Sequence, residues 1–160
     1  MKLFLKRDNS GENSRFVVYD DNGKLRYWVK GRRGTATDRM VITTVDGRPL
    51  LTLRVATFHS FSAFSVRNTQ GHFVLTLTGM PANPEFRFHG ITWRVSEFSP
   101  DKDFSVIDVD NTLIMRQKSS KNKDYYELFV ECEHRELFCI ATAICADVIN
   151  YLTLSVVAPV

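Results

Sequence analysis

Residues 136–152 read ELFCIATAICADVINYL, a segment without glycine or proline in which Leu, Ile, Ala and Cys dominate. Glu131, Glu133 and Glu136 stand just before this segment or at its start, where carboxylates stabilise the positive end of a helix dipole. The pattern predicts one helix that is apolar on nearly every side. Such a helix is either buried all round or placed in a membrane.

A membrane-spanning helix is the weaker interpretation of residues 136–152. Seventeen residues rise about 25 Å, which is short of the roughly 30 Å hydrocarbon core of a bilayer. Asp147 and Asn150 would also be costly in that core. We therefore expect the helix to lie inside a β-sheet that the rest of the chain builds around it.

The rest of the chain is typical of a meander of short antiparallel strands. The turn signals Asn22-Gly23, Asp46-Gly47 and Gln70-Gly71 recur every 24 residues, and such pairs supply the positive φ that tight hairpins need. Alternation along one strand predicts that Phe73 shares a face with Leu75 and Leu77. Twelve strands are predicted, at residues 3–7, 15–20, 25–30, 39–45, 50–57, 60–67, 72–78, 85–88, 91–98, 104–108, 112–117 and 124–130.

Length and composition predict a single domain over residues 1–160. Of the 160 residues, 44% are hydrophobic and only 8 are Gly and 5 Pro, which excludes a disordered or collagen-like chain. Three cysteines, an odd number, are not a disulfide framework, and the charged first residues do not resemble a secretory signal. We expect a reducing, cytoplasmic setting.

Positive charge is concentrated in the first hundred residues, which carry 15 basic and 8 acidic side chains, whereas the last sixty carry 6 and 10. The densest basic run is Lys24, Arg26, Lys30, Arg32 and Arg33, with no acid between them. A face of this kind attracts phosphate, from lipid headgroups or from nucleic acid. Alternatively, the cations protect an exposed sheet edge from pairing with another chain.

The order of these features resembles the tubby C-terminal-like superfamily, and most closely its small bacterial members, the LURP-one-related proteins. The segments that carry the resemblance are VYDDNG (18–23), YWVKG (27–31), DGR (46–48), FHSF (58–61) and IATAICAD (140–147). The resemblance covers essentially the whole chain. It implies a mainly β fold, a closed antiparallel barrel of about twelve strands around a central hydrophobic C-terminal helix.

The resemblance also implies a function. Tubby-like domains bind phosphoinositides through basic side chains near the end of an early strand and its loop, and KGRRGTAT (30–37) is similar to that run. This match makes Lys30, Arg32 and Arg33 the expected anion contacts, with Lys24 and Arg26 adding to the positive field. We expect a non-enzymatic module that binds anionic phospholipid headgroups or another phosphate-bearing surface at the membrane periphery. No cofactor, metal or transmembrane segment is expected.

Two alternative functions stay open. The first is a scaffold or protein-interaction domain that binds no lipid. The second is a lipocalin-like carrier, a protein of similar length whose helix packs outside an open barrel of eight strands.

Motifs for catalysis or metal binding are incomplete. The segment VIDVDNTLI (106–114) resembles the first motif of haloacid-dehalogenase phosphatases, but the residues that follow cannot build the α/β layers of such an enzyme, so we predict an Asx turn. Cys132, His134, Cys139 and Cys145 lack the two close pairs of a zinc site. Nucleic acid is not an expected partner, because the net charge is only +3.

Overall fold

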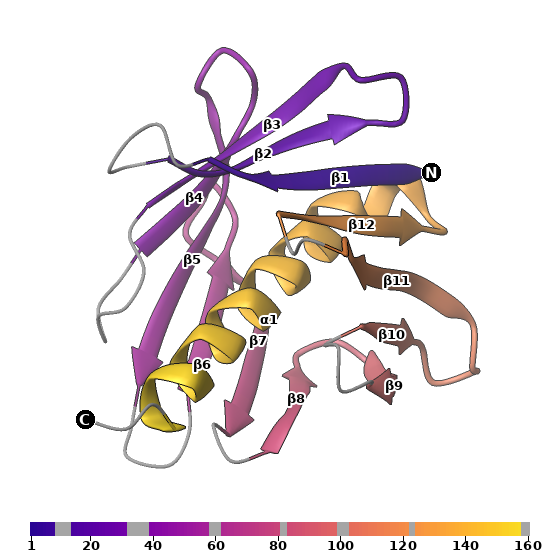
Figure 1. Cartoon of the computed structure of the whole chain (residues 1–160). Coiled ribbons are helices and arrows are strands. Elements are labelled where there is room, and N and C mark those ends of the chain that lie inside the picture. The colour runs from indigo at the N-terminus through magenta and orange to yellow at the C-terminus, as the bar shows by residue number, and fades with distance from the viewer. Residues whose placement is uncertain are drawn as a thin grey trace.

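The computed structural model describes residues 1–8, 14–31, 39–57, 62–80, 83–98, 103–121 and 124–157. In this part of the chain, twelve strands surround one long helix (Figure 1). The strands are β1 (Lys2–Arg7), β2 (Ser14–Asp20), β3 (Leu25–Gly31), β4 (Arg39–Thr43), β5 (Pro49–Thr57), β6 (Ser62–Arg67), β7 (Phe73–Met80), β8 (Asn83–His89), β9 (Arg94–Phe98), β10 (Phe104–Ile107), β11 (Leu113–Ser119) and β12 (Tyr125–Val130). A 3-10 turn, η1 (Glu133–Arg135), leads into the helix α1 (Glu136–Val157).

The twelve strands predicted from the sequence are all present, and their ends differ from the prediction by at most three residues. The largest difference is at β9, which begins at Arg94 and not at residue 91. The helix begins at Glu136, as expected, and continues past residue 152 to Val157. The fold class predicted from the sequence is confirmed.

The alternation predicted at the start of β7 is wrong for Phe73. Leu75 and Leu77 are buried, but 62% of Phe73 is exposed. The pairing of β6 with β7 shifts between Val66 and Arg67, so that Arg67 pairs with Phe73. Because side chains alternate with a period of two, an extra residue turns those beyond it to the opposite face. Phe73 therefore lies on the outer surface.

Each strand pairs antiparallel with its neighbours in the sheet order β8-β7-β6-β5-β4-β3-β2-β1-β12-β11-β10-β9. The two end strands, β8 and β9, lie on either side of the seam of a nearly closed barrel. Aromatic rings pack across this seam: Phe86 meets Phe104 edge-on with centroids 5.1 Å apart, and Phe88 meets Trp93 at 5.8 Å. Trp93 also contacts Phe138 of α1, at 6.3 Å, so the helix is joined to the seam.

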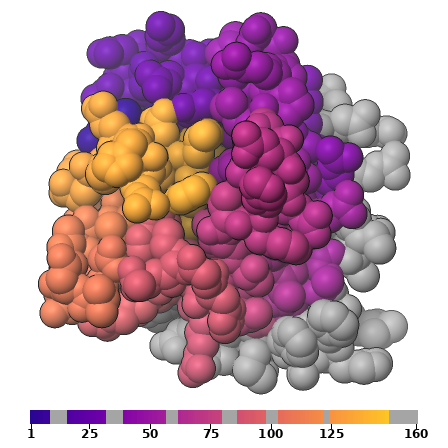
Figure 2. All heavy atoms as spheres, turned by 180° about the vertical axis from the view of Figure 1, so that it is seen from behind, coloured from indigo at the N-terminus to yellow at the C-terminus, as the bar shows by residue number. Residues whose placement is uncertain are grey.

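The middle of α1 lies inside the barrel (Figure 1). Every residue from 139 to 148 is at most 3% exposed, and these residues form one core with the inward side chains of the strands. Ala141, Ala143 and Ala146 are among them, and such small side chains let strands approach the helix axis closely. The start of α1 reaches the surface at one end of the barrel (Figure 2), where Leu137 and Phe138 are half-buried.

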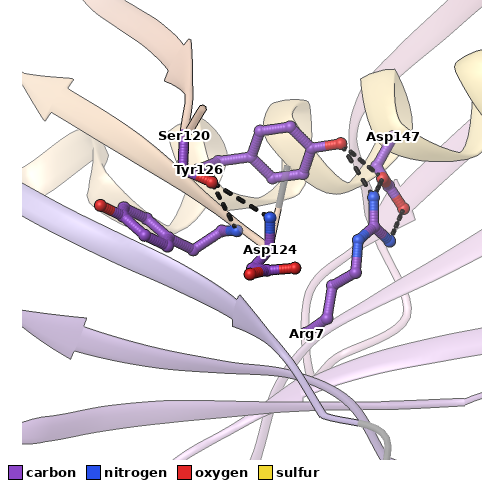
Figure 3. Close-up of polar contacts among 6 residues, drawn as sticks. Arg7, Ser120, Asp124, Tyr126 and Asp147 are labelled. Carbon is purple, nitrogen blue, oxygen red and sulfur yellow. Dashed lines mark hydrogen bonds and ion pairs between the residues drawn. The ribbon is translucent and has the colours of Figure 1, made fainter. Parts of the chain in front are cut away.

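Asp147 is the charged residue in this buried stretch, at 2% exposed. Arg7 of β1 donates to its carboxylate at 2.5 Å, and the hydroxyl of Tyr126 in β12 donates to it at 2.7 Å (Figure 3). Burial lowers the pKa of Arg7, but the charge of Asp147 and its hydrogen bonds outweigh burial and raise that pKa overall. The ion pair thus fixes the helix against the first and last strands of the chain.

Membrane insertion of α1 was the alternative to burial. Among the described residues, no helix combines the length and the apolar character needed to cross a bilayer.

Replacing Ile144 by Asp should prevent folding. Ile144 is fully buried in α1, and an unpaired charge there costs several kcal/mol or more, comparable to the roughly 5–15 kcal/mol that hold a domain together. Circular dichroism should show no cooperative thermal transition in Ile144→Asp. The matched control is Val109→Asp, at a position 75% exposed, which should melt like the wild type. A cooperative, wild-type-like transition in Ile144→Asp would place this part of α1 outside the core.

The ion pair between Arg7 and Asp147 should show strong coupling. Asp147→Ala leaves a largely buried guanidinium unpaired and should lower the free energy of unfolding by about 3–5 kcal/mol. Arg7→Ala combined with Asp147→Ala should cost clearly less than the sum of the two single changes, because neither charge is then left alone. Urea denaturation of the four proteins measures the coupling, and additive costs would contradict the role given to this pair.

Candidate anion-binding site

Four arginines line a groove of about 690 Å³ on the outer face of β4, β5 and β6. Arg39 comes from β4, Arg48 from the β4–β5 hairpin, Arg54 from β5 and Arg67 from β6. The groove that these four side chains line is called the four-arginine groove. Its other lining residues are polar or small: Pro49, Thr52, Asn68, Thr69 and Gly71.

Strand register explains why the arginines meet. Arg39 lies directly opposite Arg54 in the β4–β5 pair, and both side chains are exposed because their neighbours Met40 and Leu53 point into the core. Thr52 pairs with Arg67 of β6, which brings the next cation to the same face. Like charges directly opposite each other destabilise a sheet. An anion bound between them would remove that cost.

Arg67 is the most constrained of the four. Its guanidinium lies over the ring of Phe73, 4.1 Å from the ring centroid. Its Nε is buried and has no hydrogen-bond partner among the described residues. The bulge that turns Phe73 outward thus supplies the aromatic surface on which Arg67 rests. A guanidinium held in this way is oriented before any ligand arrives.

Among the described residues, no acidic side chain lines the four-arginine groove. A described carboxylate that interacts with one of the four arginines is Asp46, in the β4–β5 hairpin beside Arg48. A hydrogen bond from Thr44, and then its own backbone and the charge of Arg48, lower the pKa of Asp46. Asp46 is exposed and hydrogen-bonded within its turn, so the described lining of the groove keeps its positive charge.

The structure places the predicted residues of the basic run in different surroundings. Lys30 is exposed on β3 and belongs to the same lateral row as the groove, because it pairs with Val41, Val41 pairs with Thr52, and Thr52 pairs with Arg67. Lys24 is exposed in the β2–β3 turn. The predicted Arg32 and Arg33 lie outside the described residues.

Arg26 has a different environment. It donates to the carboxylate of Glu136 at 3.1 Å, and the hydroxyl of Tyr27 binds the same oxygen. Burial, together with the hydrogen bond to Glu136, raises the pKa of Tyr27. Arg26 therefore connects β3 to the first residue of α1, at the positive end of the helix dipole.

Within the described part of the basic run, the structure does not support protection of a sheet edge as the role of Lys30. β3 pairs with β2 on one side and with β4 on the other, so Lys30 does not lie on an edge strand. The four arginines also come from paired strands or from a hairpin between paired strands. The edge strands of the sheet are β8 and β9.

The phosphatase-like segment 106–114 forms the turn predicted for it. The backbone N–H of Val109 and the hydroxyl of Thr92 donate to the carboxylate of Asp108, and the N–H of Thr112 donates to Asp110. Asn111 has φ 66°, as a tight hairpin requires. In the described part of the chain, no group of three His, Cys, Asp or Glu side chains could hold a metal ion.

Comparison with known proteins agrees with this architecture. The sequence model of the LURP-one-related family matches residues 1–147. The chain belongs to the LURP-one-related family. It is 23% identical over 154 residues to the uncharacterized protein YxjI of Bacillus subtilis (strain 168), covering 94% of each chain. A solved protein from Arabidopsis thaliana has the same fold with a TM-score of 0.62, at 17% identity, over 93% of this chain and 91% of that one.

The three cysteines of this LURP-one-related protein should differ sharply in reactivity. Cys132 is half-exposed in the segment before α1, whereas Cys139 and Cys145 are buried inside the barrel. Burial raises the pKa of Cys139 to about 12 and also raises that of Cys145, so both remain protonated thiols. A thiol reagent at pH 8 should modify one cysteine per native chain and three in guanidinium chloride. Fast modification of two or three in the native protein would contradict the burial described.

Proposed function

We propose that this protein is a non-enzymatic binding module that contacts phosphate-bearing surfaces, in the first place anionic phospholipid headgroups. The observation that carries the proposal is the four-arginine groove, which gathers four guanidinium groups on one open face, with no acid among the described residues of its lining. Membership in the LURP-one-related family is consistent with a binding module.

Arginine suits this ligand better than lysine would. Its planar fork of N–H donors matches two phosphate oxygens at once, and it is always charged. Arg39 and Arg54 lie opposite each other on neighbouring strands, whose backbones are about 5 Å apart. One phosphate group can therefore accept hydrogen bonds from both guanidinium groups. Thr52 of β5, which pairs with β4 on one side and with Arg67 of β6 on the other, adds a hydroxyl donor.

The surroundings of the groove favour an extended surface as the ligand. Lys30 continues the positive face across β3, and Phe73 beside Arg67 is an exposed aromatic residue at the rim. Amphipathic segments that lie in the membrane interface combine Lys and Arg with apolar residues such as Trp, Phe and Leu. The predicted contacts Arg32 and Arg33 follow Lys30 in the chain, and we propose them as further contacts, with Lys24 adding to the field.

The two alternatives receive less support. A lipocalin-like carrier needs an open interior, whereas here α1 fills it from residue 139 to 148. A protein-interaction domain remains the competing function, and its ligand would not depend on phosphate.

Sedimentation with lipid vesicles tests the proposal. Vesicles of phosphatidylcholine with 30% phosphatidylglycerol should bind the protein at low salt, and vesicles of phosphatidylcholine alone should not. Each cation near an anionic surface contributes about 1 kcal/mol, so Arg39→Glu with Arg54→Glu should lower the partition coefficient by about thirtyfold or more. Arg32→Glu with Arg33→Glu tests the predicted segment separately.

The matched control reverses two exposed cations elsewhere, Arg87→Glu with Lys121→Glu, which changes the net charge equally. Equal losses in the control and in the Arg39/Arg54 variant would show that only net charge matters. Absence of wild-type binding to anionic vesicles would rule out the lipid proposal in favour of a protein ligand.

A further inference from the structure

A second surface combines an exposed aromatic ring and several half-buried ones with cations, on strands that do not contribute to the four-arginine groove. It covers the outer face of β2, β1, β12 and β11, and β3 separates it from the groove in the sheet. Phe129 of β12 lies at its centre and is 41% exposed. A depression of about 230 Å³ surrounds it, lined by Lys2, Arg116, Lys118, Glu127 and Phe129.

Register places Phe129 between two cations. It pairs with Lys2 of β1 on one side and with Arg116 of β11 on the other, and all three side chains are exposed. Neighbouring strands are about 4.8 Å apart, so the backbones carrying Lys2 and Arg116 stand roughly 10 Å apart with the ring between them. Lys118 faces Glu127 in the next row of the same strands.

More rings and cations extend this arrangement across β1. Phe4 packs edge-on against Tyr125 with centroids 6.1 Å apart, and the ammonium of Lys6 lies 5.5 Å from the ring centroid of Tyr19. Leu3 and Leu5 point into the core, which leaves Lys2, Phe4 and Lys6 on the outer side of β1. Rings and cations thus alternate over the surface formed by Lys2, Phe4, Lys6, Tyr19, Arg116, Lys118, Tyr125 and Phe129, called here the aromatic–cationic face.

We propose that the aromatic–cationic face binds single-stranded nucleic acid. An unpaired base can stack on Phe129, while the phosphates on either side of it contact Lys2 and Arg116, with Lys118 and Lys6 beyond. Stacking on aromatic side chains together with a cationic track for the backbone is how proteins bind single strands without sequence preference. The small net charge of the whole chain does not predict this ligand, because only strand pairing gathers these cations around a ring.

The composition of the face favours nucleic acid over a protein partner. Three of its four cations are lysines, and lysine is depleted at protein–protein interfaces, whereas it is a usual phosphate contact in nucleic-acid complexes. Glu127 is the acidic residue in the lining of the depression, and Lys118 lies opposite it. A duplex hides the faces of its bases, so the exposed ring of Phe129 has no role in binding one.

Fluorescence anisotropy with labelled 12-nucleotide oligo(dT) and oligo(rU) tests the proposal. Both should bind in 50 mM salt, and log K should fall with log salt with a slope of about −2 to −3, which corresponds to three or four phosphate contacts. Phe129→Ala should weaken binding about 5- to 100-fold. Arg116→Gln should make the slope shallower by about 0.7.

The matched control for the ring is Phe73→Ala, which removes an exposed phenylalanine of β7 (62% exposed, against 41% for Phe129) and should leave oligonucleotide binding unchanged. Arg39→Ser with Arg54→Ser should also leave it unchanged, and Phe129→Ala should bind anionic vesicles like the wild type, so that the two proposals can fail separately. Circular dichroism checks folding, and Arg116→Gln carries the test if Phe129→Ala does not fold.

Three results would each overturn the proposal. The first is no detectable binding of either oligonucleotide at 100 μM protein in 50 mM salt. The second is binding that Phe129→Ala and Arg116→Gln leave at the wild-type level. The third is a blunt duplex of the same length that binds as tightly as the single strand.

Discussion

Burial of α1 inside the barrel is the contact on which the other features of this protein depend. Twelve strands closing on themselves enclose more space than their own side chains fill. Residues 139–148 occupy that space and are shielded from water by the strands on all sides. The helix in turn has no polar face with which to meet solvent. Neither the sheet nor the helix could bury its apolar surface without the other, and Asp147, paired with Arg7, fixes how they fit together.

Because α1 fills the interior of the barrel along residues 139–148, we expect ligands to bind on its outer surface. Recognition would then use the outer faces of strands and the hairpins between them. The two faces described here are built by the same device, which is cross-strand register. In the four-arginine groove, register places Arg39 opposite Arg54. On the aromatic–cationic face, it places Phe129 between Lys2 and Arg116.

The sequence predicted the fold because its strongest signals are local. An apolar segment without glycine and hairpin turns such as Asp46-Gly47 are visible in a single chain. Part of the groove was within reach too, since the pairs from Arg39–Arg54 to Ile42–Leu51 are those that a two-residue turn at Asp46-Gly47 predicts, although the register shifts between Ile42 and Thr43. Arg67 was not, because no turn signal fixes the β5–β6 register and a bulge shifts the strand that follows. β1 pairs with β12, the first strand of the sequence with the last, and no local sequence pattern indicates such a contact.

Hydrogen exchange of the backbone amides of residues 139–148 tests the central claim most directly. If these residues are the core that closes the barrel, their amides should exchange only when the whole protein unfolds, with the same free energy as the slowest amides of β1, β5 and β12. Urea should lower that free energy with the full slope of global unfolding. Exchange of residues 139–148 through a smaller opening, while the strands stay protected, would contradict the claim, because the barrel would then persist without its helix.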